Sequence, residues 1–194
     1  GGVKTAVCGN IAVGAYGIIN RTTMFFVMIV FGVTQGMQPI LGYNYGAGRW
    51  NRVTETLKKG IWIGVGITTL GWIITQTFPD VVSSMFTTDI TMIDIARSGF
   101  HIYFLIYPVV GAQIVIQNYF QSIGHPNMSI FLSLTRQLIF LVPLLWLLPP
   151  HFGIDGVWAS MAVSDFLAFI LAIVTMIVMN RKLKKHFNNI PAEQ

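Results

Sequence analysis

Five long runs of apolar residues, almost free of charge, divide the chain. They lie at about residues 20–43, 60–79, 100–123, 127–148 and 156–180. A helix crosses a bilayer with ~20 apolar residues, so each run predicts a membrane-spanning helix. Helix-breaking prolines stand near the ends of these runs, at Pro79, Pro126 and the Pro149–Pro150 pair. The pattern predicts an all-α membrane protein in which residues 20–180 form one transmembrane bundle.

The segments outside the runs are predicted to be short. Residues 1–19 contain several glycines together with Lys4 and Asn10, and we interpret them as the end of a preceding helix followed by an outer loop. Because the first residue is Gly1, we expect the chain to be the carboxyl-terminal part of a larger protein. Residues 80–98 are expected to form a short amphipathic piece on the outer surface, and residues 181–194 a basic tail.

Basic residues predict the orientation in the membrane. Eight of the twelve lysines and arginines fall in two segments that are separated by four runs: Arg49, Arg52, Lys58 and Lys59, then Arg181, Lys182, Lys184 and Lys185. An even number of spans places both segments on one side, and the positive-inside rule makes that side cytoplasmic. The carboxyl end is therefore predicted to be cytoplasmic.

Composition excludes several other classes of protein. Only 10% of the residues are charged, against about 25% in soluble domains. The net charge of +5 comes from blocks that follow the topology rule, so nucleic acid is not an expected partner. One cysteine excludes a cysteine-based metal site, and the sequence motifs of common hydrolases and nucleotide-binding enzymes are absent. We therefore expect a membrane protein without catalytic residues or a metal site.

The segment from Gly32 to Gly48 carries unusual residues for a simple span. Gln35, Gln38 and Gly42 share one helix face, and Pro39 interrupts the hydrogen bonds of the helix. The face either lines a polar cavity or bonds neighbouring helices. Glycines four residues apart predict close helix contacts, and they occur as the pairs Gly32/Gly36, Gly42/Gly46 and Gly60/Gly64.

A second polar stripe lies in the run at 100–123. Gln113, Gln117 and Gln121 are four residues apart, with Asn118 beside them, so their amides line one helix face. We favour a wet or ligand-facing surface, because one neighbouring helix would have to satisfy the whole stripe. The alternative is ordinary hydrogen bonding between helices.

Arg136 and Asp165 are charged residues well inside the predicted spans. An isolated charge at that depth costs several kcal/mol or more, so each is expected to have a partner or water. Counting ~1.5 Å per residue from the span ends places them roughly 8–9 Å apart in depth, a gap that an arginine side chain largely covers. Either they form an ion pair that orders the last two helices, or Asp165 carries a transported ion.

A resemblance adds a family to this picture. The motif GMQPILGYNYGAG at 36–48, followed by RWNRV, and AVGAYGI at 12–18 resemble the multidrug and toxic compound extrusion (MATE) transporters, in particular their bacterial drug-efflux subgroup. The resemblance extends from about Asn10 to Asn180. It implies that the chain is the carboxyl-terminal six-helix bundle of such a transporter, containing its last five helices and the end of the helix before them.

The resemblance also implies site residues. Gln35 and Gln38 would belong to the central substrate cavity. The inner mouth would be formed by the motif residues Tyr43 to Gly48, and Pro39, Asn44 and Gly46 belong to the same motif.

The function implied is antiport, the export of cationic drugs in exchange for protons or sodium ions across the bacterial inner membrane. Its partner would be an amino-terminal six-helix lobe. That lobe would also contain the main binding site for the coupling ion, because the run at 100–123 contains no acidic residue. No other cofactor is implied. Two alternatives stay open: a flippase for lipid-linked saccharides from the same superfamily, and a structural membrane subunit.

Overall fold

The computed structural model describes the backbone of residues 2–188 and the side chains of residues 9–185. Every element of regular structure in this part of the chain is helical. The elements are α1 (Gly2–Gly46), α2 (Trp50–Thr77), α3 (Pro79–Ser84), α4 (Ile90–Tyr103), the 3₁₀ turn η1 (Phe104–Ile106), α5 (Tyr107–Ser122), α6 (Pro126–Leu134), the π-helix η2 (Thr135–Leu141), α7 (Val142–Leu147) and α8 (Pro149–Asn188).

Five helical units in the described part of the chain are long and apolar enough to cross a membrane. They are Gly9–Gly46, Trp50–Thr77, Ile90–Ser122, Pro126–Leu147 and Pro149–Lys185. The all-α membrane fold that the apolar runs predict is therefore confirmed. The third unit is the centre of the bundle, because 61% of its most apolar window is buried, against 11–28% in the other four.

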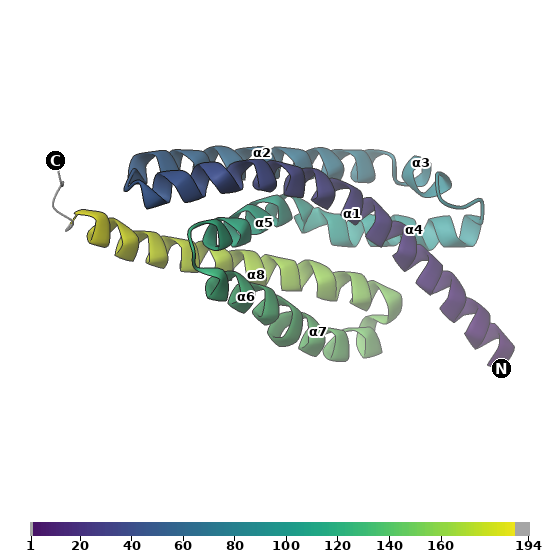
Figure 1. Cartoon of the computed structure of the whole chain (residues 1–194). Coiled ribbons are helices and arrows are strands. Elements are labelled where there is room, and N and C mark those ends of the chain that lie inside the picture. The colour runs from purple at the N-terminus through teal and green to yellow at the C-terminus, as the bar shows by residue number, and fades with distance from the viewer. Residues whose placement is uncertain (1, 189–194) are drawn as a thin grey trace.

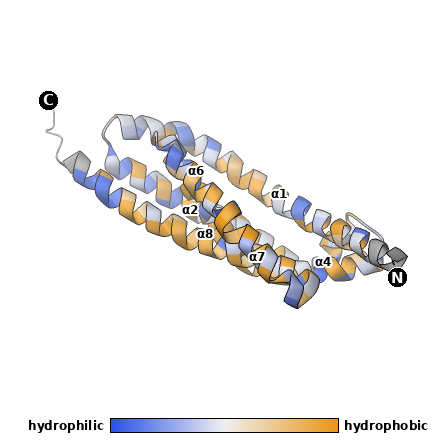
Figure 2. Ribbon diagram, turned by 90° about the horizontal axis from the view of Figure 1, so that it is seen from below, coloured by the Kyte–Doolittle hydropathy of each residue, from blue (hydrophilic) through white to orange (hydrophobic). Residues whose placement is uncertain are grey.

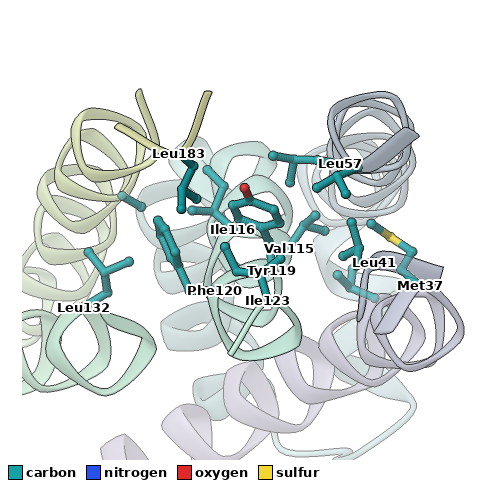
Figure 3. Close-up of a cluster of buried hydrophobic side chains, with 13 residues drawn as sticks. Met37, Leu41, Leu57, Val115, Ile116, Tyr119, Phe120, Ile123, Leu132 and Leu183 are labelled. Carbon is teal, nitrogen blue, oxygen red and sulfur yellow. The ribbon is translucent and has the colours of Figure 1, made fainter. Parts of the chain in front are cut away.

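The helices pack on both sides of this central unit (Figure 1). α1 and α2 contact each other and cover one side of α5, while α6 and α8 cover another. Figure 3 shows the resulting core at one end of the bundle, where Tyr119 and Phe120 of α5 lie between Leu41 of α1, Leu57 of α2 and Leu183 of α8. The long apolar run at 100–123 thus becomes the helix that every other long helix contacts.

The start of the chain differs from the sequence-based expectation. α1 is one helix from Gly2 to Gly46, so residues 2–19 form neither the end of a separate helix nor a loop. The reason is packing: Ala15, Ile18 and Ile19 are buried at helical spacing in a core cluster with α4 and α8. The glycines among them are tolerated because this packing stabilises the helix.

The third span also begins earlier than expected. Only Pro79–Ser84 forms a separate short helix, and α4 already begins at Ile90. The Asp89 side chain caps α4 by accepting hydrogen bonds from the backbone of Thr91 and Met92. Arg97 then holds α3 against α4 through two hydrogen bonds to Asp80, of 2.7 and 2.8 Å, and this pairing lowers the pKa of the Asp80 carboxyl.

Polar residues gather at the ends of the bundle. The α1–α2 turn and the carboxyl end of α8, which carry the two basic segments, lie at the same end (Figure 1). Figure 2 shows hydrophobic residues along the middle of α8 and hydrophilic residues toward its carboxyl end. Both basic segments thus lie at one end of the bundle, as an even number of spans between them requires.

The predicted glycine contact of α2 is confirmed. Gly60 and Gly64 are buried, and Gly64 faces Gly111 of α5 so closely that a Cβ atom on Gly111 would overlap the Gly64 carbonyl. Thr68 lies one turn further and its hydroxyl is 3.0 Å from the carbonyl oxygen of Pro108. Gly32 and Gly36, by contrast, are exposed, and a Cβ atom on either would meet nothing within 4 Å, so the close approach expected there is absent from the described structure.

Replacing Gly111 with alanine is expected to lower the free energy of unfolding by about 1–3 kcal/mol, because the added methyl overpacks this helix crossing. Thermal unfolding of the purified protein in detergent measures the loss. Gly66→Ala is the matched control, since nothing lies within 4 Å of a Cβ at that position. Equal losses in both variants would show that the Gly64–Gly111 contact does not limit stability.

Candidate functional site

A groove opens between α1 and the segment formed by α6, η2 and α7. α1 makes its main contacts with α2, α4 and α5, whereas α6, η2 and α7 pack on one another and on α8, with α6 also on α5. Two cavities follow one another along this groove. The arginine cavity, of about 340 Å³, is lined by Asn20 and Thr23 of α1, Tyr103 of α4, Arg136 and Gln137 of η2, and Ser164 and Asp165 of α8, among others. The amide cavity, of about 280 Å³, is lined by Phe31 of α1, Gln117, Asn118 and Gln121 of α5, and Ser129 and Ser133 of α6, among others.

An ion pair joins two walls of the arginine cavity. The Arg136 Nε atom lies 2.6 Å from Asp165 Oδ1, and the Tyr103 hydroxyl donates a 3.3 Å hydrogen bond to Asp165 Oδ2. The Asp165 side chain is only 2% exposed, while the Arg136 side chain is 37% exposed. The negative charge is thus enclosed by protein, and the positive charge borders the cavity.

The local helix geometry explains where Arg136 lies. Pro143 has no N–H group, and its ring crowds the carbonyl one turn earlier. The helix widens before it, and the backbone N–H of Val142 bonds to the carbonyl of Gln137, five residues back. Such π segments are rare and occur frequently at functional sites. Here the widened turn carries Arg136 and Gln137 into the cavity wall.

Tyr107 ties α1 to the central unit beside the same cavity. Its hydroxyl donates a 2.8 Å hydrogen bond to the carbonyl of Thr23, in the middle of α1. The Thr23 hydroxyl is itself satisfied by the carbonyl of Ile19. The Tyr107 bond thus holds the α1 wall of the arginine cavity at Thr23.

The amide stripe of α5 divides into two parts. Gln117 and Asn118 line the amide cavity, and Gln121 lies there too. Gln113 does not line it: this side chain is 2% exposed, and neither of its amide atoms has a hydrogen-bond partner within the described part of the chain. One end of the stripe therefore lines the amide cavity, and the other end is buried.

Cysteine labelling can separate these two ends. With Cys8 replaced by serine, the variants Gln117→Cys and Asn118→Cys are expected to react with a water-soluble maleimide in the complete transporter. Gln113→Cys should react at least about tenfold more slowly, because a buried thiol is reached only through local opening. Equal rates at positions 113 and 117 would contradict the arrangement.

The remaining predicted residues lie outside both cavities. Gln35 and Gln38 are exposed on α1, and Pro39 lies within the same helix, which continues past it to Gly46. Tyr43 and Asn44 border a third, open cavity of about 410 Å³ near the α1–α2 turn, together with Arg49, Arg52 and Lys59. The Asn44 amide donates to the carbonyl of Ile40 at 2.8 Å.

Sequence reasoning missed part of the site. Asn20 lines the arginine cavity, but it stood at the edge of the segment interpreted as a loop. Tyr103 was missed because a tyrosine in an apolar run gives no sign that its hydroxyl reaches a carboxylate on another helix. Two adjacent polar pairs, Ser164–Asp165 and Arg136–Gln137, were local signals, since such pairs are unusual inside a span. In the described chain no cluster of three or more histidine, cysteine or acidic residues forms a metal site.

Comparison with known proteins places this architecture in a family. The family model described as MatE matches residues 4–147. Multidrug export protein MepA of Staphylococcus aureus (strain N315) is 24% identical over 176 residues, which are 90% of this chain and 38% of MepA. The chain thus spans less than half the length of the curated relatives that it matches.

Solved structures show the same fold. The MATE multidrug transporter DinF-BH matches with a TM-score of 0.76 and 39% identity over 84% of this chain and 36% of its own. The bent form of the Vibrio cholerae MATE transporter VcmN matches with a TM-score of 0.84 and 20% identity over 91% of this chain and 40% of its own. From its membrane-spanning helices and the family match over most of its length, the chain belongs to the MatE family of membrane transporters.

Proposed function

We propose that this chain is the carboxyl-terminal lobe of a secondary active antiporter that exports cationic drugs. The observation that carries the proposal is the polar groove at membrane depth in a bundle that otherwise has an apolar exterior. Amides, hydroxyls and an arginine are expensive to present to lipid. They fit a surface that faces water or substrate in the assembled transporter.

The partner in this proposal is an amino-terminal lobe of the same protein. The exposed face of α1 around Gln35 and Gln38 is the part of the surface that we assign to the central cavity between the lobes. It carries two amides and the open glycines Gly32 and Gly36, which leave room for a substrate or for a neighbouring helix. The names of MepA and DinF-BH as multidrug transporters support drugs as the substrate class.

The coupling ion is a proton or a sodium ion in this proposal, and its main site lies in the other lobe. Asp165 is the described acidic side chain that lines the groove at membrane depth, and it is held by Arg136. A carboxylate whose charge is balanced by a cationic partner at 2.6 Å binds a second cation weakly. We therefore assign Asp165 a structural role in the last helix pair.

The location we propose is the bacterial inner membrane, with the α1–α2 turn and the end of α8 on the cytoplasmic side. Both segments carry clustered lysines and arginines, which the positive-inside rule assigns to the cytoplasm. The aspartates Asp80, Asp89, Asp94 and Asp155 then lie toward the outer side.

Ethidium efflux tests the proposal. The complete gene is expressed in bacteria that lack their own drug exporters, and loss of cellular ethidium fluorescence is followed after energising the cells. Faster loss than in cells with an empty vector, abolished by dissipating the ion gradients, is the expected result. If ethidium and other cationic dyes leave no faster, the flippase or the structural subunit replaces the antiporter as the better interpretation.

A further inference from the structure

The guanidinium of Arg136 has hydrogen-bond donors that the ion pair does not use. Its Nε atom contacts Asp165, and no other described residue accepts a hydrogen bond from this side chain. A guanidinium carries five N–H donors in a planar fork. Because the side chain is 37% exposed and lines the arginine cavity, the unused donors border that cavity.

The rest of the polar lining also favours a negatively charged ligand. Asn20 and Gln137 are exposed side chains on opposite walls, and within the described part of the chain neither has a protein hydrogen-bond partner. Asp165, the one acidic residue of the lining, is almost fully enclosed behind Arg136. The charge that the cavity presents is therefore positive, although the pair as a whole is neutral.

A flat aromatic wall completes the cavity. Tyr16 also lines it, is 39% exposed, and stacks on the buried ring of Trp158 with centroids 6.1 Å apart and planes 12° apart. This stacking fixes the orientation of the tyrosine ring. The cavity thus combines a rigid ring with a charged fork of donors.

We propose that the arginine cavity is a binding site for the carboxylate of a planar aromatic molecule, with Arg136 as the residue that binds the carboxylate. Guanidinium groups recognise carboxylates by paired hydrogen bonds, and an aromatic wall favours a planar ligand body. Asp165 positions the guanidinium and competes with the ligand for it. This inference rests on the proposed drug-export function and specifies one class of substrate for it.

Rhodamine B and its ethyl ester are suitable probes, because they share one planar cationic chromophore and only rhodamine B has a free carboxylate. Their binding to the purified complete transporter is measured by fluorescence polarisation. The variant that combines Arg136→Gln with Asp165→Asn removes both charges and leaves no unpaired buried ion. It should bind rhodamine B about tenfold or more weakly than the wild type, because charge-assisted hydrogen bonds are lost. The ester should change by no more than about twofold, since the variant removes no net charge.

Asp165→Asn alone gives a result of opposite sign. It removes the competitor for the guanidinium, so the affinity for rhodamine B should rise about three- to tenfold relative to that for the ester, whose cationic chromophore gains only repulsion from the unpaired arginine. Arg21→Gln is the matched control: Arg21 is an exposed arginine of α1 that does not line the cavity. Its rhodamine affinities should equal those of the wild type.

The outcomes separate this inference from the proposed function. If the wild type binds the ester but the double variant binds both probes with wild-type affinity, Arg136 pairs only with Asp165 and binds no ligand. The inference is then overturned. It is equally overturned if Asp165→Asn leaves the ratio of rhodamine B affinity to ester affinity unchanged. If rhodamine B binds through Arg136 while the ester is not bound, the carboxylate site stands, and the ethidium assay decides separately on the export of cationic drugs. Absence of binding by both probes overturns the inference, whereas the proposed export function is overturned only by the ethidium assay.

Discussion

Replacing Arg136 with alanine should lower the free energy of unfolding by about 3–5 kcal/mol, because it leaves a carboxylate without its cation inside the protein. Asp165 is only 2% exposed, so it has almost no surface through which to recover hydration. The Tyr103 hydroxyl is its one other described partner, at 3.3 Å, and cannot replace a charge. Denaturant unfolding in mixed micelles, followed by tryptophan fluorescence, measures the difference.

Two further variants make the prediction specific. Asp165→Asn should cost less, about 1–2 kcal/mol, because the arginine left behind is partly exposed and the asparagine keeps a hydrogen bond from Tyr103. Arg136→Gln combined with Asp165→Asn should recover most of the loss of Arg136→Ala. If Asp165→Asn proves as damaging as Arg136→Ala, the asymmetric burial of the two charges is not what governs stability.

Replacing Trp158 with alanine should lower the free energy of unfolding by about 3–5 kcal/mol, since a large buried ring would leave a void. Trp158 is 1% exposed, and a Cβ atom on Gly99 of α4 would lie 2.9 Å from its ring. Neighbouring helices cannot close such a void without moving α4 against α8. Thermal unfolding in detergent, with light scattering to detect aggregation, measures the effect.

Trp158→Phe is the control for this prediction. The indole N–H of Trp158 has no hydrogen-bond acceptor within the described residues, so phenylalanine loses ring volume and no hydrogen bond. A loss below about 1.5 kcal/mol is expected, as for other conservative apolar exchanges. If phenylalanine were as damaging as alanine, the indole nitrogen would have a role that the fold alone does not explain.

The number and type of the helices could be predicted because apolar runs of bilayer length leave few other structures. The boundaries were less predictable. Glycines and Asn10 suggested a break before residue 20, but the burial of Ile18 and Ile19 against distant helices keeps α1 continuous. Local sequence carries no sign of such a contact. The start of α4 was misjudged although Asp89, a good helix cap, was visible in the sequence.

The candidate site was partly predictable for a similar reason. Amides at helical spacing indicated a polar face, and Gln117 and Asn118 lie on the amide cavity. Spacing does not indicate where that face ends, so the burial of Gln113 was missed. Depth counting placed Arg136 and Asp165 roughly 8–9 Å apart, since it assumes regular helices. The π segment and the lateral reach of arginine bring their atoms to 2.6 Å.

The widened turn from Thr135 to Leu141 also makes the length of this helix adjustable. A π segment holds one residue more than the α-helical turns that it replaces. Removing a single residue there would let the chain rewind as an ordinary α-helix while α6 and α7 keep the faces that they turn to α8. The same deletion in α5, which is enclosed by its neighbours, would rotate every following side chain out of place. A deletion at this turn can therefore change the direction in which Arg136 points while the packing of the bundle is kept. The polar lining of the groove can change in the same way without a change of fold.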